Sequence, residues 1–370
     1  MKKLCAVLVC LLLFFSFGRA DASAEGILRA AGDEAGLSHL REGLSREELE
    51  IGGSLSPTGT YDAAGALARL WESLRERGLE ELRAQLRSSL RLVVLILFCS
   101  LAEGLTENRA AREGIGLAAC CTAAMWIAGD WDSGIAQATS VLLRLSDYSR
   151  AALPVLYTAA AASGAMSSAP LRYAACSLAM EVLMSLSRSL VLPLIYAYLA
   201  LSLTGCLTDS SLLRALQRLV KWSAVTLLSA VTMLFGFAIA LSSAVAASAD
   251  AAAVKAARTV ISAALPVVGG ILADSAGTLL SAASVIRSTA GAFSLIAVCT
   301  LCSGPFLFLL LKMLLLRAAG TLAELLPGGA LARLLDECAN TFAMLLALVG
   351  CAGAMLFISL AAGMRAVSGV

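Results

Sequence analysis

The chain has 370 residues, of which 59% are hydrophobic and 15% are charged, and its formal net charge is +2. Soluble proteins contain roughly 25% charged and 45–50% apolar residues, so this composition excludes an ordinary soluble globular protein. The small net charge also argues against the basic surface that nucleic-acid binding requires. With a mean hydropathy of +0.85, the chain is predicted to be an all-α, polytopic membrane protein whose main solvent is lipid.

Residues 1–24 have the three parts of a secretory signal peptide. Lys2 and Lys3 form the basic start, and the apolar stretch over 4–17 is too short to span a bilayer comfortably. The small residues Ala-Ser-Ala at 22–24 then supply a cleavage site. The alternative is an uncleaved anchor helix. In both cases the segment that follows is expected to be exported.

Residues 25–89 form the one stretch whose charge density is typical of a soluble segment. Pro57 and several glycines separate a weak helical pattern over 27–50 from a stronger one over 62–91. In the second pattern, leucines and Trp71 recur every three or four residues between glutamates and arginines, which predicts an amphipathic helix. Such a helix can lie on the membrane surface, pack on a partner or lead, solvated, into the first span.

From residue 91 onward, apolar stretches alternate with short basic segments. A helix needs about 20 apolar residues to cross a bilayer, and on this criterion we predict eight spans, with six to nine compatible with the pattern. The predicted spans are 91–105, 114–128, 151–169, 173–204, 222–248, 265–286, 289–317 and 341–364. The first two, within 90–149, are short, whereas 173–204 is long enough to bend or to contain a re-entrant piece. Basic residues show no clear bias between alternate loops, so the orientation rests on the signal peptide.

The second half of the chain contains a predicted internal repeat, with units at 150–250 and 262–366. The sequence AALPV at 151–155 recurs at 263–267. Each unit contains three predicted spans, and an odd number of spans would insert the two units in opposite orientations. Inverted repeats of this kind are the basis of many transporter folds.

Prolines support the repeat because the chain contains only seven of them. Pro154 and Pro193 are 39 residues apart, and so are Pro266 and Pro305. Interrupted helices at corresponding positions of two repeats are a pointer to a binding site or passage. These four prolines are therefore candidate site residues.

Charged residues inside predicted spans are also candidates, because each costs about 2.5–3.5 kcal/mol on insertion scales. Glu181 and Arg188 are seven residues apart and so share a helix face, where they can pair across the bundle or mark an elbow at the interface. Glu103 lies near the end of a span. Lys312 lies near Arg317 and is expected to extend toward the interface.

Asp274 is the intramembrane charge with the least access to water. It lies near the middle of the predicted span 265–286, with Pro266, Gly269 and Gly270 before it. The small neighbours permit close helix approach. Two interpretations remain open: a polar site that faces a pore or cavity, and a carboxyl group held by a hydrogen bond at a helix or subunit contact.

No pattern in the sequence indicates an enzyme, a cofactor or a metal site. The motifs GxxxxGK[ST], HExxH and GxSxG are absent, and His39 is the single histidine. The cysteine pairs at 120–121 and 299–302 lack the second pair or the histidines of a zinc site. We therefore expect no catalytic, cofactor-binding or metal-binding residues, and any energy must come from a gradient or from a separate ATPase.

With LPVVGGILADSAG at 265–277, the chain resembles the stage III sporulation protein AE family of endospore-forming bacteria. The order of the other features is similar as well: signal peptide, exported amphipathic segment, LPV…SG at 153–164, KAARTVIS at 255–262 and a final long apolar pair. The resemblance covers roughly residues 90–365. Pro266, Gly269, Gly270 and Asp274 are matched motif positions, and the family assigns them no catalytic role.

The resemblance implies a protein of the mother-cell membrane around the forespore. Family members belong to a channel or secretion-like complex that joins the two cells, in which sister stage III proteins form rings and supply the ATPase and a forespore stage II protein completes the passage. The chain is then the non-enzymatic, permease-like element in the lipid. Two alternatives remain: a self-sufficient secondary transporter of a small solute, and a membrane scaffold on which the complex assembles.

Overall fold

A computed structural model of the chain describes residues 44–52, 61–163, 168–207, 211–264, 269–324 and 329–364, with only the backbone described over 242–282. Within these residues every regular element is a helix, so the predicted all-α class is confirmed. The predicted signal peptide lies outside the described residues, and so do 25–43 and 53–60 of the segment 25–89.

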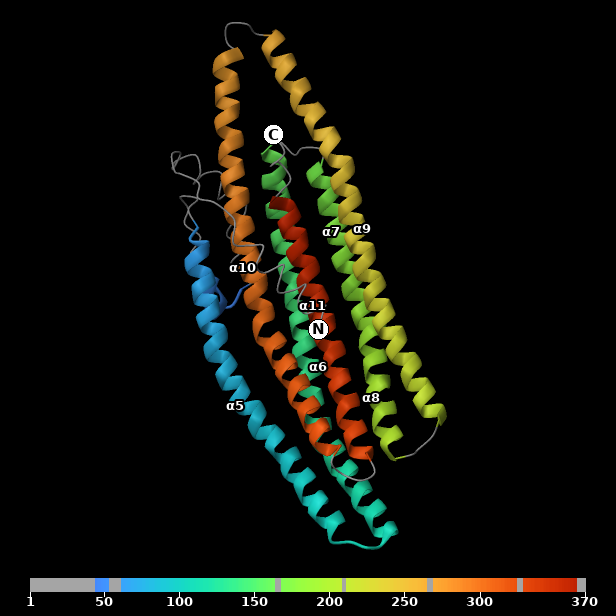
Figure 1. Cartoon of the computed structure of the whole chain (residues 1–370). Helices are drawn as coiled ribbons and strands as arrows, with labels where there is room; N and C mark the ends of the chain where they lie inside the picture. Colours follow the sequence, from blue (N-terminus) through green and yellow to red (C-terminus); the bar gives the residue numbers. More distant parts are fainter. Residues whose placement is uncertain are drawn as a thin grey trace.

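The elements, in chain order, are α4 (Arg46–Gly52), α5 (Ala63–Gly104), α6 (Arg109–Ala162), α7 (Ser168–Leu186), the π-helical turn η2 (Ser187–Val191), α8 (Leu192–Leu207), α9 (Ser211–Ala264), α10 (Gly269–Ala323) and α11 (Ala330–Met364). The long helices run side by side in an elongated bundle, with α5 and α9 at opposite edges of the view (Figure 1). Helix α11 packs against α6, α7, α8, α9 and α10 and forms the centre of the apolar core.

Five helical segments of the described chain are long and apolar enough to cross a membrane. They are Ala63–Ala102, Ala169–Gly205, Ser211–Leu241, Ala283–Ala323 and Ala330–Met364. The prediction of a membrane protein agrees with this finding, whereas the prediction of eight separate spans is not supported.

Two pairs of predicted spans each lie along one continuous helix. The stretches 114–128 and 151–169 belong to α6 up to Ala162, and 265–286 and 289–317 belong to α10 from Gly269 onward. The polar residues between the members of each pair lower the hydropathy. They include no proline and no two adjacent glycines, so the helix continues through them. The predicted amphipathic helix and the first predicted span are likewise joined in α5.

The continuity of α10 affects the predicted repeat. The first unit covers the end of α6, the helices α7, η2 and α8, and most of α9. Within the described residues, the second contains the last residues of α9, then α10 and α11. The inverted orientation of the two units was inferred from three spans in each, so that inference loses its basis. The repeat itself stays a prediction from the sequence.

The predicted irregularity within 173–204 is a π-helical turn. The backbone N–H of Leu192 bonds to the carbonyl oxygen of Ser187, five residues earlier, just before Pro193. A proline ring clashes with the carbonyl four residues before it, and a wider turn relieves that clash. The helix therefore continues from α7 through η2 into α8, without a re-entrant piece. Pro154 and Pro305 lie inside continuous helices, α6 and α10.

Helix α6 approaches α11 closely at Gly134, which allows a paired test of the packing. A methyl group on Gly134 would lie 2.7 Å from a ring carbon of Phe342, whereas one on Gly129 meets no atom within 4 Å. Phe342 is fully buried and its ring lies 5.3 Å from that of Trp131, so it cannot move away freely.

We therefore expect Gly134→Ala to lower the free energy of unfolding by about 1–3 kcal/mol. Gly129→Ala should raise it by about 0.5–1 kcal/mol, because alanine is the better helix former. Unfolding midpoints in detergent micelles measure both changes, and equal shifts in the two variants would contradict the packing.

Candidate functional site: polar networks between apolar helices

A buried ion pair joins α5, α6 and α10. Lys312 is 2% exposed, and its ammonium group pairs with the Asp130 carboxylate. The hydroxyl of Ser88 donates to the same carboxylate oxygen at 3.3 Å. One charge pair therefore links three helices in the apolar bundle.

This arrangement corrects the expectation that Lys312 extends toward the interface. The face of α10 that carries Lys312 is covered by α5 and α6, so the ammonium group cannot leave the bundle. The Asp130 side chain is 34% exposed, so the carboxylate, and not the ammonium group, is the accessible end of the ion pair. Asp130 is not among the site residues predicted from the sequence, because it lies outside every predicted span.

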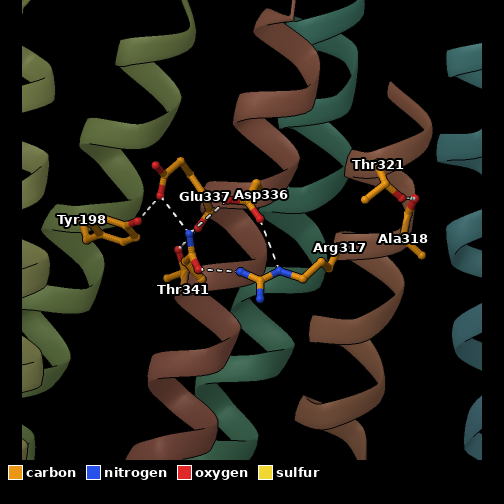
Figure 2. Close-up of polar contacts among 8 residues, drawn as sticks. Tyr198, Arg317, Ala318, Thr321, Asp336, Glu337 and Thr341 are labelled. Atoms are coloured by element: carbon orange, nitrogen blue, oxygen red, sulfur yellow. Dashed lines mark hydrogen bonds and ion pairs between the residues drawn. The ribbon is translucent and has the colours of Figure 1, made fainter. Parts of the chain in front are cut away.

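A second network connects α8, α10 and α11, and Figure 2 shows its contacts. The Arg317 guanidinium donates from Nη2 to Asn340 Oδ1 at 3.0 Å and from Nε to Asp336 Oδ1 at 3.3 Å. The Asn340 amide then donates to Glu337 Oε2 at 3.3 Å, and the same carboxylate oxygen accepts the hydroxyl of Tyr198. Four side chains of α10 and α11 are thus connected to a tyrosine of α8.

Helix α9 contacts the same network through a cation. The ammonium group of Lys221 lies 5.7 Å from the ring centroid of Tyr198, within the range of a cation–π interaction. The residue Tyr198 is 1% exposed, whereas the side chains of Arg317 and Asp336 are about half exposed. The network therefore runs from the surface of the bundle to a buried hydroxyl group.

Two buried arginines lie at helix C-termini. Arg287 of α10 donates to the hydroxyl of Ser163, the C-terminal cap of α6, at 3.0 Å. Arg172 of α7 lies near the last turn of α11, with Nη1 3.5 Å from the carbonyl oxygen of Ala362. Positive charges at helix C-termini are favourable because the terminal carbonyl groups carry partial negative charge. Both arginines therefore have a structural explanation.

The short helix α4 is attached to α6 by Glu48. Its N-terminus is a capping box, in which the backbone N–H of Ser45 donates to Glu48 Oε2 at 2.8 Å and that of Glu48 lies 3.4 Å from the hydroxyl of Ser45. Arg144 donates to both oxygens of Glu48, at 2.5 and 2.6 Å. Burial raises the pKa of Glu48, but the hydrogen bonds from Ser45 and Arg144 and the charge of Arg144 outweigh it, so the net pKa is lowered.

A lowered pKa in the folded state means that the carboxylate stabilises α4 above the ordinary carboxyl pKa of 4.5. This contribution is lost as the pH falls through the lowered value. We expect Glu48→Gln, which mimics the protonated acid, to weaken α4 docking at pH 7 by about 1 kcal/mol. Faster amide exchange in α4 measures the loss, with Glu50→Gln on the exposed side of α4 as the control. Equal exchange in the two variants would contradict the role of Glu48.

Glu181 and Arg188 do not pair with each other in the structure. Glu181 lies 4.0 Å from Arg150 of α6, and both side chains are about two-thirds exposed. Arg188 lies exposed in the π-helical turn. The extra residue of this turn shifts the seven-residue spacing, so Arg188 is no longer on the same helix face as Glu181. An exposed pair at this distance contributes little to stability.

The motif around Asp274 is only partly described. Gly269 and Gly270 begin α10, and Asp274 lies in its second turn, where α10 and the end of α9 extend beyond their neighbours (Figure 1). Pro266 and the side chain of Asp274 lie outside the described residues, so the predicted site stays a prediction. Within the part of the chain that the structure describes, no group of three metal-ligating side chains is close enough to bind a metal ion.

Comparison with known proteins gives two matches. The model of the family described as Stage III sporulation protein AE matches residues 60–366. Stage III sporulation protein AE of Bacillus subtilis (strain 168) is 22% identical over 273 residues, which cover 73% of this chain and 68% of the relative. No solved structure matches the chain.

Proposed function

The chain belongs to the stage III sporulation protein AE family, and we propose that it is a permease-like, non-enzymatic membrane component of the channel or secretion complex of sporulation. The family match carries this proposal, because it covers every helix from α5 to α11. The five candidate membrane spans support a place in the lipid.

The proposed location is the mother-cell membrane around the forespore. The proposed partners are other stage III sporulation proteins, including a separate ATPase, and a forespore stage II protein, together with membrane lipid. The sequence supports a separate energy source because it contains no phosphate-binding GxxxxGK[ST] loop.

Deletion of the gene in its own host tests the proposal. Loss of heat-resistant spores, restored by the wild-type gene, is the expected result. Spore development in the deletion strain is expected to stop after the forespore has formed, because the complex acts between the two cells. Normal spore numbers in the deletion strain would contradict the proposal.

We propose that Asp274 lines the passage through this membrane protein. Asp274→Asn and Asp274→Ala should each reduce spore formation at least tenfold while the chain remains in the membrane with its partners. Loss of assembly in both variants would indicate a structural carboxyl instead. Normal spore numbers and normal assembly in both would remove Asp274 from the proposed site.

A self-sufficient secondary transporter is the second candidate. The observation that favours it is the ion pair of Lys312 and Asp130, because charges within an apolar bundle are common in transport pathways. Purified chain in lipid vesicles separates the two candidates. Accumulation of a solute against its gradient by the chain alone would favour the transporter, whereas no accumulation is expected of a component that depends on an ATPase.

A further inference from the structure

One side of α5 changes from charged to apolar along its length. The exposed residues on this side follow one another at steps of three, four or seven, as residues on one helix face do. They are Glu72, Glu76, Arg83 and Arg87, with Leu79 and Leu86 among them, in the first half and Leu90, Val94, Leu97 and Leu101 in the second. Within the described residues, the four charged side chains take part in none of the ion pairs that the structure contains.

The charged half of α5 lies beside the most apolar part of α10. The ring of Tyr61, just before α5, is 5.8 Å from that of Phe293, and Gly78 lies against Leu307. Further along, Ser88 shares the carboxylate of Asp130 with Lys312. These contacts place residues 61–88 alongside 293–312, inside the candidate span Ala283–Ala323.

A candidate membrane span at the same level makes lipid an unfavourable neighbour for the charged half of α5. A bilayer interior cannot solvate four unpaired charges on one helix face. Figure 1 shows α5 at the edge of the bundle, and the four charged side chains are exposed. Either water or protein must therefore cover the charged residues.

We propose that further copies of this chain surround the outer side of α5, so that the α5 helices of several copies face a shared water-filled axis. The chain carries both acidic and basic residues on this side, so a neighbouring copy supplies opposite charges within one or two helical turns. Arg75, for example, is on the flank opposite Glu80, and adjacent copies bring these two flanks together.

Membrane orientation explains why the axis contains water. Copies inserted in the same direction lie parallel, so each Glu76 is level with the Glu76 of its neighbours and each Arg83 with the other Arg83 residues. Like charges at one level repel in a dry contact but are tolerated around water. Leu90, Leu97 and Leu101 then form the apolar part of the same axis.

This inference rests on the proposed permease-like role and adds the element that would line the passage. It is tested by adding one cysteine at a time and labelling it in membranes from sporulating cells. The parent chain carries Cys121→Ser, because Cys121 is the exposed thiol among the described cysteines. The test positions are Glu76→Cys and Arg83→Cys. Met233→Cys on α9, 76% exposed on an apolar face, is the matched control.

We expect a membrane-impermeant thiol reagent to label the two α5 cysteines at least tenfold faster than the Met233→Cys control. Mild oxidation should also give chain-to-chain dimers through Glu76→Cys but not through Met233→Cys. Slow labelling at both α5 positions would overturn the inference, and so would rapid labelling with cross-links only to a different protein. Spore counts in the same strains test the proposed function separately, so the inference about α5 and the proposed function can fail independently.

Discussion

Asp130→Asn is expected to lower the free energy of unfolding by about 3–5 kcal/mol, the usual cost of removing one partner from a buried ion pair. The cost arises because the Lys312 side chain, 2% exposed, loses its counter-ion. Lys312→Met should cost less, since the remaining carboxylate of Asp130 is 34% exposed and can contact water.

The double variant Lys312→Met/Asp130→Asn distinguishes this account from simple loss of packing. Removing both charges should recover most of the stability that Asp130→Asn alone loses, because no unpaired buried charge remains. Unfolding midpoints in detergent micelles give the three values. If the double variant is as unstable as the sum of the two single variants, the pair does not act as a unit.

Glu337→Ala is expected to lower the free energy of unfolding by about 1–3 kcal/mol, because the buried hydroxyl of Tyr198 loses its acceptor. Tyr198→Phe removes the unsatisfied hydroxyl, so the double variant Glu337→Ala/Tyr198→Phe should be no less stable than Glu337→Ala. Asp336→Ala, one residue earlier and 54% exposed, is the matched control and should cost less than about 1 kcal/mol. Equal losses for the two acids would contradict the distinction between the buried and exposed ends of the network.

The helical class and the membrane environment could be predicted because they depend on composition, which needs no knowledge of neighbours. The resemblance at residues 265–277 also led to the family that the comparisons show. The π-helical turn before Pro193 follows from the chemistry of a single residue type, whereas α6 and α10 continue through Pro154 and Pro305, where interruptions were expected.

Helix continuity and charge pairing could not be predicted in the same way. Arg287 interrupts the hydropathy profile, yet its side chain caps α6 through Ser163 while α10 continues past it. Lys312 and Asp130 are 182 residues apart, so their pairing depends on how α6 packs against α10. Hydropathy counts apolar residues along the chain and carries no information on which helix face a neighbour covers.

The proposed function requires the chain to act within a sporulation complex. The most direct measurement is purification of the tagged chain from membranes of sporulating cells, followed by identification of the proteins that remain bound. We expect an ATPase and other stage III sporulation proteins to be recovered with it in fixed ratio. Recovery of the chain without them, at the stage when spore formation requires the gene, would contradict the proposed function.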